Sequence, residues 1–233
     1  MEPGGGGTNS VPRPRSVLLA GATGLVGGHL LERLGADPGI ARIVAPVRRA
    51  PTGPLPRTAE AVVVDFGRLD DHPDLFAVDQ IFLCLGTTMK RAGSPAAFRS
   101  VDLDLVVEMA GRALNSGAED CLLVSSLGAD PRARVLYSRV KGEAERAVRA
   151  LPWRTLAILR PSLLAGDRAE SRPAERLALA ATSLLGPLMR GPLARYRPVE
   201  AAQVAETMVR LARDHESGTR VYESERIRAI AEA

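Results

Sequence analysis

The chain has 233 residues, of which 45% are hydrophobic, 25% charged and only 3% aromatic, with a net charge of +4. These values fit a globular protein with one α/β domain, and the scattered basic residues exclude a nucleic-acid-binding footprint. No signal-peptide pattern and no apolar run of about 18 residues occurs. We therefore expect a soluble cytoplasmic protein without a membrane partner. Cys84 and Cys121 lie in apolar runs without metal-ligand spacing, which predicts reduced core thiols and no metal site.

Residues 1–14 hold four consecutive glycines and three prolines, which predicts a flexible tail. Residues 16–20 then predict a strand and residues 25–34 a helix, joined by a glycine turn. Gly21 permits a sharp exit from the strand, Gly24 lets backbone approach a pyrophosphate, and Gly27 lets the helix pack closely on the sheet. The free N–H groups of the helix start suit phosphates. The candidate cofactor-binding residues here are Gly21, Thr23, Gly24, Leu25, Val26 and Gly27.

This glycine spacing is weak evidence alone, because a chain with 22 glycines shows it by chance about 0.2 times, and a purely structural turn is the alternative. The second predicted strand, residues 42–47, ends at Arg48 and Arg49 and not at an acid. An acid there would bind the ribose 2′-hydroxyl of NAD, whereas two guanidiniums suit the 2′-phosphate of NADPH. A surface pair in an arginine-rich chain is the alternative. Asp65, which ends the third strand (60–65), could reach the adenine.

Further strands are predicted at residues 80–85, 120–126 and 155–160, with a short helix or turn at 69–77 and helices at 95–115 and 137–150. This alternation predicts an α/β fold: a single, doubly wound, mostly parallel Rossmann-like sheet in three layers, over residues 15–233. Leu85, Gly86 and Thr87 should lie along the cofactor ribose. Backbone from Pro161 to Leu164, with Leu163 between them, should face the nicotinamide carboxamide.

Residues 162–233 are less regular, with helices predicted at 173–185 and 199–213 and a short strand at 219–223. Substrates bind at the carboxyl ends of the strands in such folds. We therefore expect residues 162–233 to form a cap on the substrate side of the sheet.

Tyr137 and Lys141 are four residues apart, so they share one face of the predicted helix. A lysine ammonium there favours the phenolate form of the tyrosine, which can then exchange a proton with a carbonyl or alcohol oxygen. The pair is specific, since the chain has three tyrosines and only two lysines, Lys90 and Lys141, among 31 basic residues. An arginine could not serve as the same compact charge. The alternative is an incidental pair on a solvated helix face.

Ser125 and Ser126 end the fifth predicted strand, before Tyr137. A serine hydroxyl at this edge could donate a hydrogen bond to the substrate oxygen. We favour Ser126 as the catalytic serine and Ser125 as structural. The alternative is that both only satisfy the end of the strand.

The order of the glycine turn, Ser126, Tyr137 and Lys141 resembles the short-chain dehydrogenase/reductase superfamily, in its atypical NAD(P)-binding branch. The segments Leu83–Thr88, Ser125–Asp130, Tyr137–Glu143 and Arg160–Pro173 are similar to the Tat-interacting-protein oxidoreductases and their bacterial relatives. The resemblance covers about residues 16–175. It implies a Rossmann-like fold, NADPH as cofactor, and a reductase whose substrate is poorly defined.

One departure concerns the proton relay, because the superfamily places an asparagine in the long helix where this chain has Asp102 and Asp104. Arg168, in the last similar segment, is a further candidate for cofactor binding. Residues 170–173 could close over the cofactor, anchor an anionic substrate, or only start a helix.

Three functions are compatible with these residues. The first is an NADPH-dependent oxidoreductase acting on a carbonyl or alcohol, with Tyr137, Lys141 and Ser126 as catalytic residues. The second is an NADPH-binding regulatory protein with little turnover, since the fold allows binding alone. The third is a sugar-nucleotide epimerase, which ranks lowest because residues 162–233 offer little room for a nucleotide-sugar domain. We expect a small-molecule substrate and a monomer or homodimer.

Overall fold

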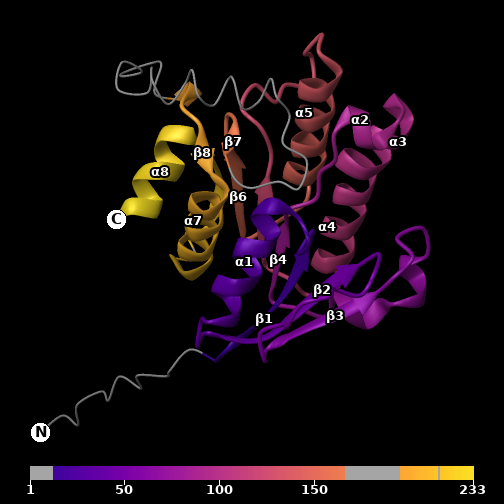
Figure 1. Cartoon of the computed structure of the whole chain (residues 1–233), viewed down its shortest axis with the longest axis vertical. Coiled ribbons are helices and arrows are strands. Elements are labelled where there is room, and N and C mark those ends of the chain that lie inside the picture. Colours follow the sequence, from indigo (N-terminus) through magenta and orange to yellow (C-terminus); the bar gives the residue numbers. More distant parts are fainter. Residues whose placement is uncertain (1–12, 166–194, 215) are drawn as a thin grey trace, which may run out of the picture.

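The computed structural model describes residues 13–165, 195–214 and 216–233. Strands and helices alternate along this part of the chain (Figure 1). The strands are β1 (Arg15–Ala20), β2 (Ile40–Val47), β3 (Ala59–Val63), β4 (Gln80–Leu83), β5 (Asp120–Val124), β6 (Thr155–Arg160), β7 (Leu164–Ala165), β8 (Val199–Glu200) and β9 (Gly218–Glu223). The helices are α1 (Leu25–Gly35), α2 (Met89–Ala92), α3 (Pro95–Arg99), α4 (Leu105–Asn115), α5 (Leu136–Arg149), α7 (Ala201–Asp214) and α8 (Ser224–Glu232).

The main sheet has seven strands in the order β3-β2-β1-β4-β5-β6-β9, and every neighbouring pair is parallel. The chain moves outward from β1 to β3, then crosses back and continues from β4 on the other side of β1. The switch point of this doubly wound sheet therefore lies between the carboxyl ends of β1 and β4, where such folds bind their ligands. The predicted Rossmann-like fold is confirmed.

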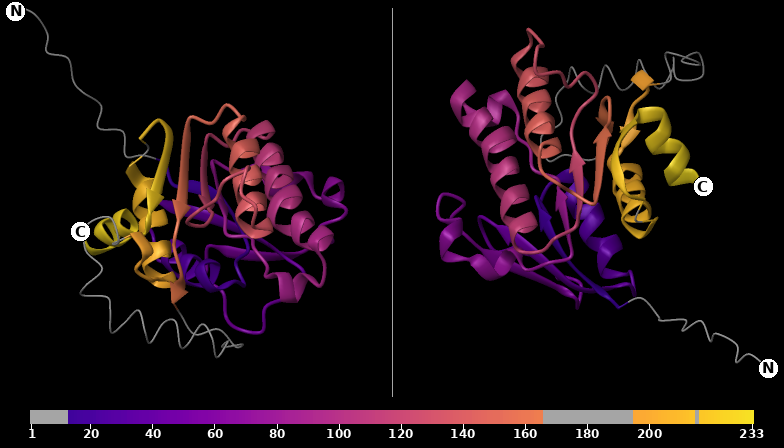
Figure 2. Two further views of the ribbon diagram at one scale, coloured as in Figure 1. Left: turned by 90° about the horizontal axis from the view of Figure 1, so that it is seen from above. Right: turned by 180° about the vertical axis from the view of Figure 1, so that it is seen from behind.

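Helices cover both faces of the sheet and produce three layers (Figures 1 and 2). Helices α4 and α5 lie on one face, and α1 and α7 pack together on the other. The alternation of side chains along β1 divides the core in two: Val17 and Leu19 pack with α1 and α7, whereas Leu18 and Ala20 pack with α4. Strands buried on both faces are continuously apolar, as this strand is.

The carboxyl-terminal part of the chain contributes more to the sheet than the expected cap implies. β9 pairs with β6 along its whole length and α7 packs on α1, so both belong to the Rossmann core. Residues 161–165 and 195–200, in which β7 pairs with β8, are the described part of the expected cap that lies on the carboxyl side of the sheet. The sequence did not predict α8. The expected helix at 173–185 and most of the expected tail, residues 1–12, lie outside the described residues.

The predicted long helix of residues 95–115 is interrupted. Ser94 caps α3 by accepting a hydrogen bond from the Ala97 N–H at 3.1 Å, and a π-helical turn spans Ser100–Asp104 before α4 begins. A π turn inserts one extra residue and rotates the side chains that precede it relative to those that follow. Here it buries Asp102 completely and leaves Asp104 exposed.

Candidate active site

The glycine turn between β1 and α1 has the geometry of a phosphate-binding turn. Gly21 has a φ of +89°, and a Cβ there would lie 2.6 Å from the Cys84 carbonyl oxygen. Only glycine fits both restraints. A Cβ on Gly27 would collide with the Gly21 carbonyl. We expected Gly27 to bring the helix close to the sheet, but its contact is with the turn itself.

The start of α1 offers a cradle for an anion. Gly24 is the N-cap and has no side chain to cap the helix. Within the described residues, no side chain caps the first N–H groups of α1, which lie at the switch point of the sheet and fit a pyrophosphate. Thr23 is exposed and Leu25 half-buried, while Val26 is buried, so its side chain belongs to the core.

The cationic residues expected at the 2′-position follow β2, the strand beside β1. Arg48 and Arg49 are both exposed, and neither makes a hydrogen bond or ion pair with another described residue. Their guanidiniums are therefore available to an anion. Asp65 is also exposed, after β3, and its Oδ1 accepts a hydrogen bond from the Gly67 N–H at 2.9 Å, which shapes its own turn.

The loop after β4 is held by Asp102. The Thr87 N–H donates a hydrogen bond to Asp102 Oδ2 at 2.8 Å, and a Cβ built on Gly86 would lie 3.4 Å from the other carboxylate oxygen. Leu85 is half-buried and packs against the core on the α4 face. The hydrogen bond to Asp102 therefore fixes the backbone of the loop, residues 85–87, that follows β4 at the switch point.

Lys141 lies on α5 and contacts the same carboxylate. Its Nζ is 2.8 Å from Asp102 Oδ1, which is the distance of an ion pair. Both side chains are buried, with 8% of the lysine and 0% of the aspartate exposed. Asp102 was noticed in the sequence as a departure from the superfamily's asparagine, but its pairing with Lys141 was not predicted.

Tyr137 occupies the first turn of α5, four residues before Lys141, and is 38% exposed. Its ring packs against the buried Phe98 of α3, with centroids 5.8 Å apart and planes tilted by 33°. Its hydroxyl makes no hydrogen bond to any described residue. The ring is therefore supported on one side while the hydroxyl is free to meet a ligand. Phe98 was missed by the sequence reading.

Ser125 and Ser126 follow β5, and both are buried. The Ser125 hydroxyl has no hydrogen-bond partner among the described residues, and the Ser126 hydroxyl makes only a long bond, 3.4 Å, to the Leu127 carbonyl. Neither hydroxyl is strongly committed within the protein. Each hydroxyl could therefore donate a hydrogen bond to a substrate.

Gly142 brings the serine loop close to α5. A Cβ at this position would collide with the backbone of Asp130 and Pro131. The Asp130 N–H also donates to the Ser138 carbonyl at 3.1 Å. The glycine after Lys141 thus allows the loop that follows Ser126 to cross the helix that carries Tyr137. The sequence reading did not identify this role.

The stretch after β6 is tied to its neighbours. The Pro161 carbonyl accepts a hydrogen bond from the Leu127 N–H at 2.9 Å, and the Leu163 carbonyl accepts one from the Val199 N–H at 3.0 Å. Leu164 pairs with Val199 in the small second sheet. Each carbonyl keeps one lone pair for a ligand. Arg168 and residues 170–173 lie outside the described residues.

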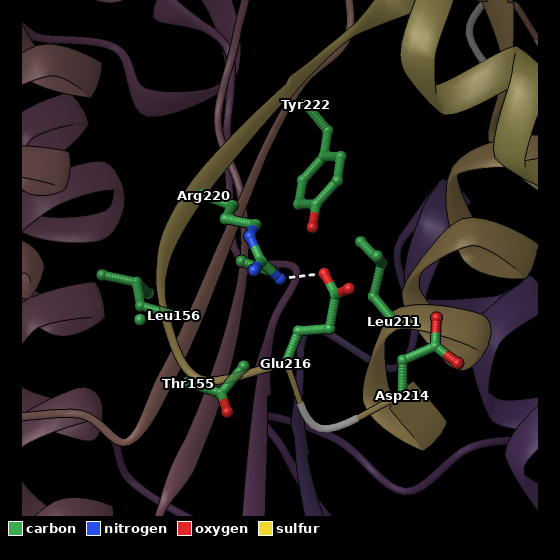
Figure 3. Close-up of a pocket in the computed structure, with 9 residues that line it drawn as sticks. Thr155, Leu156, Leu211, Asp214, Glu216, Arg220 and Tyr222 are labelled. Carbon is green, nitrogen blue, oxygen red and sulfur yellow. Dashed lines mark hydrogen bonds and ion pairs between the residues drawn. The ribbon is translucent and has the colours of Figure 1, made fainter.

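The remaining expectations concern the cysteines, a metal site and a membrane span. Burial raises the pKa of the Cys84 thiol to about 12 and also raises that of Cys121, and both cysteines are free. In the described part of the chain, no cluster of three metal-ligating side chains occurs, and no helix is long and apolar enough to span a membrane. A shallow pocket lined by Thr155, Glu216, Arg220 and Tyr222 opens where β6 and β9 begin (Figure 3). It lies at the ends of the strands opposite the candidate site.

Comparison with known proteins identifies the lineage. Residues 17–222 match the model of the NAD dependent epimerase/dehydratase family. The chain belongs to this family. Mitochondrial protein fmp52 from Emericella nidulans is 40% identical over 177 residues, covering 73% of this chain and 76% of its own. HTATIP2 from Rattus norvegicus is 37% identical over 167 residues, covering 70% and 69%. The expected relationship to Tat-interacting proteins is confirmed.

Solved structures agree on the fold. The oxidoreductase ylbE from Lactococcus lactis aligns with a TM-score of 0.66 at 18% identity, covering 93% of this chain and 95% of its own. MoeE5 in complex with UDP-glucose and NAD aligns with a TM-score of 0.65 at 20% identity, covering 88% and 74%. At these identities the likeness concerns the fold alone.

The expectation of a cytoplasmic location is wrong on these comparisons. Several relatives named fmp52 carry the word mitochondrial in their names, including those from Emericella nidulans, Aspergillus clavatus and Aspergillus niger. The expectation rested on the lack of a signal-peptide pattern, which reports on secretion and says nothing about other compartments.

Proposed function

We propose that this family member is an NADPH-dependent oxidoreductase that transfers hydride between the nicotinamide and the carbonyl or alcohol group of a small-molecule substrate. The observation that carries the proposal is the pairing on α5 of a half-exposed Tyr137 with a buried Lys141, beside the loop that leaves β4 at the switch point. A phenol with a free hydroxyl and a desolvated cation one turn away is suited to proton transfer.

The cofactor assignment rests on the chemistry of the donors. The uncapped N-terminus of α1 suits the pyrophosphate, and Arg48 and Arg49 suit a 2′-phosphate through charge-assisted hydrogen bonds. Asp65 would lie near the adenine, and Gly86 and Thr87 along a ribose. Because no acid follows β2, nothing there favours the 2′-hydroxyl of NAD.

In reduction, the bound nicotinamide would supply the hydride. Tyr137 donates its hydroxyl proton to the substrate oxygen, and Ser126 donates a hydrogen bond to the same oxygen. The Lys141 ammonium, one turn away on α5, would offset the negative charge that Tyr137 acquires. In oxidation, the same proton returns to the phenolate.

Replacement of Tyr137 by phenylalanine tests the proposal. The variant keeps the ring contact with Phe98 but loses the proton donor, so NADPH-dependent turnover should fall by about 10²–10⁴-fold. Tyr222→Phe is the matched control, because Tyr222 lies on β9 beside the distant pocket (Figure 3). Equal turnover in the two variants would refute the proposed mechanism.

The family match supports a second candidate, a sugar-nucleotide epimerase. The matching model describes epimerases and dehydratases, and MoeE5 was solved with UDP-glucose and NAD. In that case the cofactor would be retained through purification, and epimerisation would proceed without net cofactor consumption. Net NADPH oxidation with a carbonyl compound would exclude this alternative.

A further inference from the structure

Asp102 joins three segments of the candidate site through one carboxylate. It lies on the π turn, its Oδ2 accepts the Thr87 N–H at 2.8 Å, and its Oδ1 is 2.8 Å from Lys141 Nζ. The residue has no exposed surface. The π turn, the loop after β4 and α5 therefore meet at a single buried anion.

A buried carboxylate is destabilising unless it is paired, and this one is paired twice. The ammonium carries three donors and contacts a single oxygen of Asp102, so it keeps hydrogen-bond donors for another partner. The same Nζ lies 3.5 Å from the position of a Cβ built on Gly86. The ammonium is thus held against a residue that has no side chain to cover it.

We propose that Asp102 is a positioning residue that holds the Lys141 ammonium against Gly86 and fixes the Gly86–Thr87 backbone at the same time. The cation is then in place for a ribose hydroxyl and for Tyr137 before any ligand arrives. The consequence for turnover rests on the proposed function, but the positioning itself does not. Asparagine at this position would keep the acceptor for the Thr87 N–H and lose the negative charge, so it separates the two roles.

The lysine content of the chain allows a direct test without a cofactor. Only Lys90 and Lys141 are lysines, and Lys90 is exposed, so protein labelled with ¹³C,¹⁵N-lysine carries its own reference signal. Lys141→Arg assigns the spectrum. In Asp102→Asn, the Lys141 Cε signal should shift and its ammonium hydrogens should exchange at least tenfold faster, while Lys90 stays unchanged. Asp104→Asn is the matched control, since Asp104 is exposed on the same turn.

Unchanged Lys141 signals in a folded Asp102→Asn variant would overturn the proposal. If that variant does not fold, the wild-type protein decides: Lys141 should show slowly exchanging ammonium hydrogens that Lys90 lacks, and equally fast exchange at both lysines would overturn it.

The dissociation constant of NADPH distinguishes a positioning role of Asp102 from a purely structural role. Asp102→Asn should raise the dissociation constant of NADPH about tenfold in the wild-type background and leave it unchanged in the Lys141→Met background, because the aspartate acts through the lysine. Equal effects in both backgrounds would contradict this. If wild-type protein binds no NADPH, the proposed function fails, and the lysine signals alone decide the positioning role.

Discussion

Two ion pairs with buried carboxylates involve α5 residues one turn apart, and they are built differently. Glu145 accepts two hydrogen bonds from Arg160, at 2.8 and 2.6 Å, which join α5 to the end of β6. Lys141, four residues earlier, meets Asp102 through one oxygen at 2.8 Å. The planar guanidinium matches the carboxylate and fixes both partners, whereas the ammonium keeps donors available.

This difference distinguishes an ion pair that joins two elements of the fold from one that leaves its cation able to bind a ligand. In the Glu145–Arg160 pair, two guanidinium N–H groups donate to Glu145 within the protein. These hydrogen bonds raise the pKa of the Arg160 guanidinium. The Asp102–Lys141 pair lies beside Gly86 and one turn from a free tyrosine hydroxyl. Helix α5 therefore carries Glu145, whose charge joins the helix to β6, and one turn earlier Lys141, whose charge we propose to serve catalysis.

The largest expected difference in turnover is between two double variants, each of which replaces one pair with apolar residues of similar size. Such swaps of buried pairs are often neutral or stabilising, whereas removal of one partner costs about 3–5 kcal/mol. Glu145→Leu/Arg160→Met should therefore unfold in urea near the wild-type midpoint and keep its turnover. Glu145→Ala alone should lose about 3 kcal/mol, toward the lower value because Arg160 is partly exposed.

The corresponding swap at the other pair should give the opposite result. Asp102→Leu/Lys141→Met should remain folded by circular dichroism, yet turnover should fall by about 10²-fold or more, because the cation that serves Tyr137 is lost. The proposed difference between the two ion pairs is wrong if this double variant keeps its turnover or if the Glu145→Leu/Arg160→Met variant loses it.

A smaller effect is expected at Gly142, between the two pairs. Alanine there would push the backbone of Asp130 and Pro131 off the helix, so unfolding free energy should fall by about 1–3 kcal/mol. Turnover should fall as well, since this loop carries Ser126. Gly111→Ala on α4 is the control: open space surrounds a Cβ there, and stability should rise by up to about 1 kcal/mol. Equal stability changes would show that the loop contact is unimportant.

Two further cations, Arg48 and Arg49, are exposed and have no protein partner in the described chain, and their loss should affect cofactor binding. Arg48→Ala/Arg49→Ala should weaken NADPH binding by about 10–100-fold and leave NADH binding almost unchanged, measured by fluorescence titration, because only NADPH carries the 2′-phosphate. Arg42→Ala is the control, since Arg42 already pairs with Glu60. Equal losses for both cofactors would refute the NADPH preference.

The sequence predicted the features that depend on local spacing. Tyr137 and Lys141 were found because i and i+4 residues share a helix face, and the glycine turn because strand and helix flank it. The partner of Lys141 could not be found this way. Asp102 and Asp104 both stand near the place of the superfamily's asparagine, and only the π turn decides which of them is buried.

Long-range packing accounts for the other omissions. The role of Gly142 depends on the path of a loop that contacts α5, and Phe98 meets Tyr137 only because α3 packs beside α5. The cap was predicted too broadly for a similar reason. Nothing in residues 218–223 reveals that they pair with β6 and extend the sheet.

Transfer of deuterium from labelled NADPH to a carbonyl compound is the direct test of hydride transfer by this protein. Wild-type protein would be incubated with NADPH carrying deuterium at the transferable C4 position and with a panel of carbonyl compounds, and the products analysed by mass spectrometry. Hydride transfer should give an alcohol with one deuterium on the carbinol carbon, formed by wild-type and Tyr222→Phe protein but at least 10²-fold less by Tyr137→Phe. Tight NADPH binding without any deuterated alcohol would contradict it and favour a regulatory role.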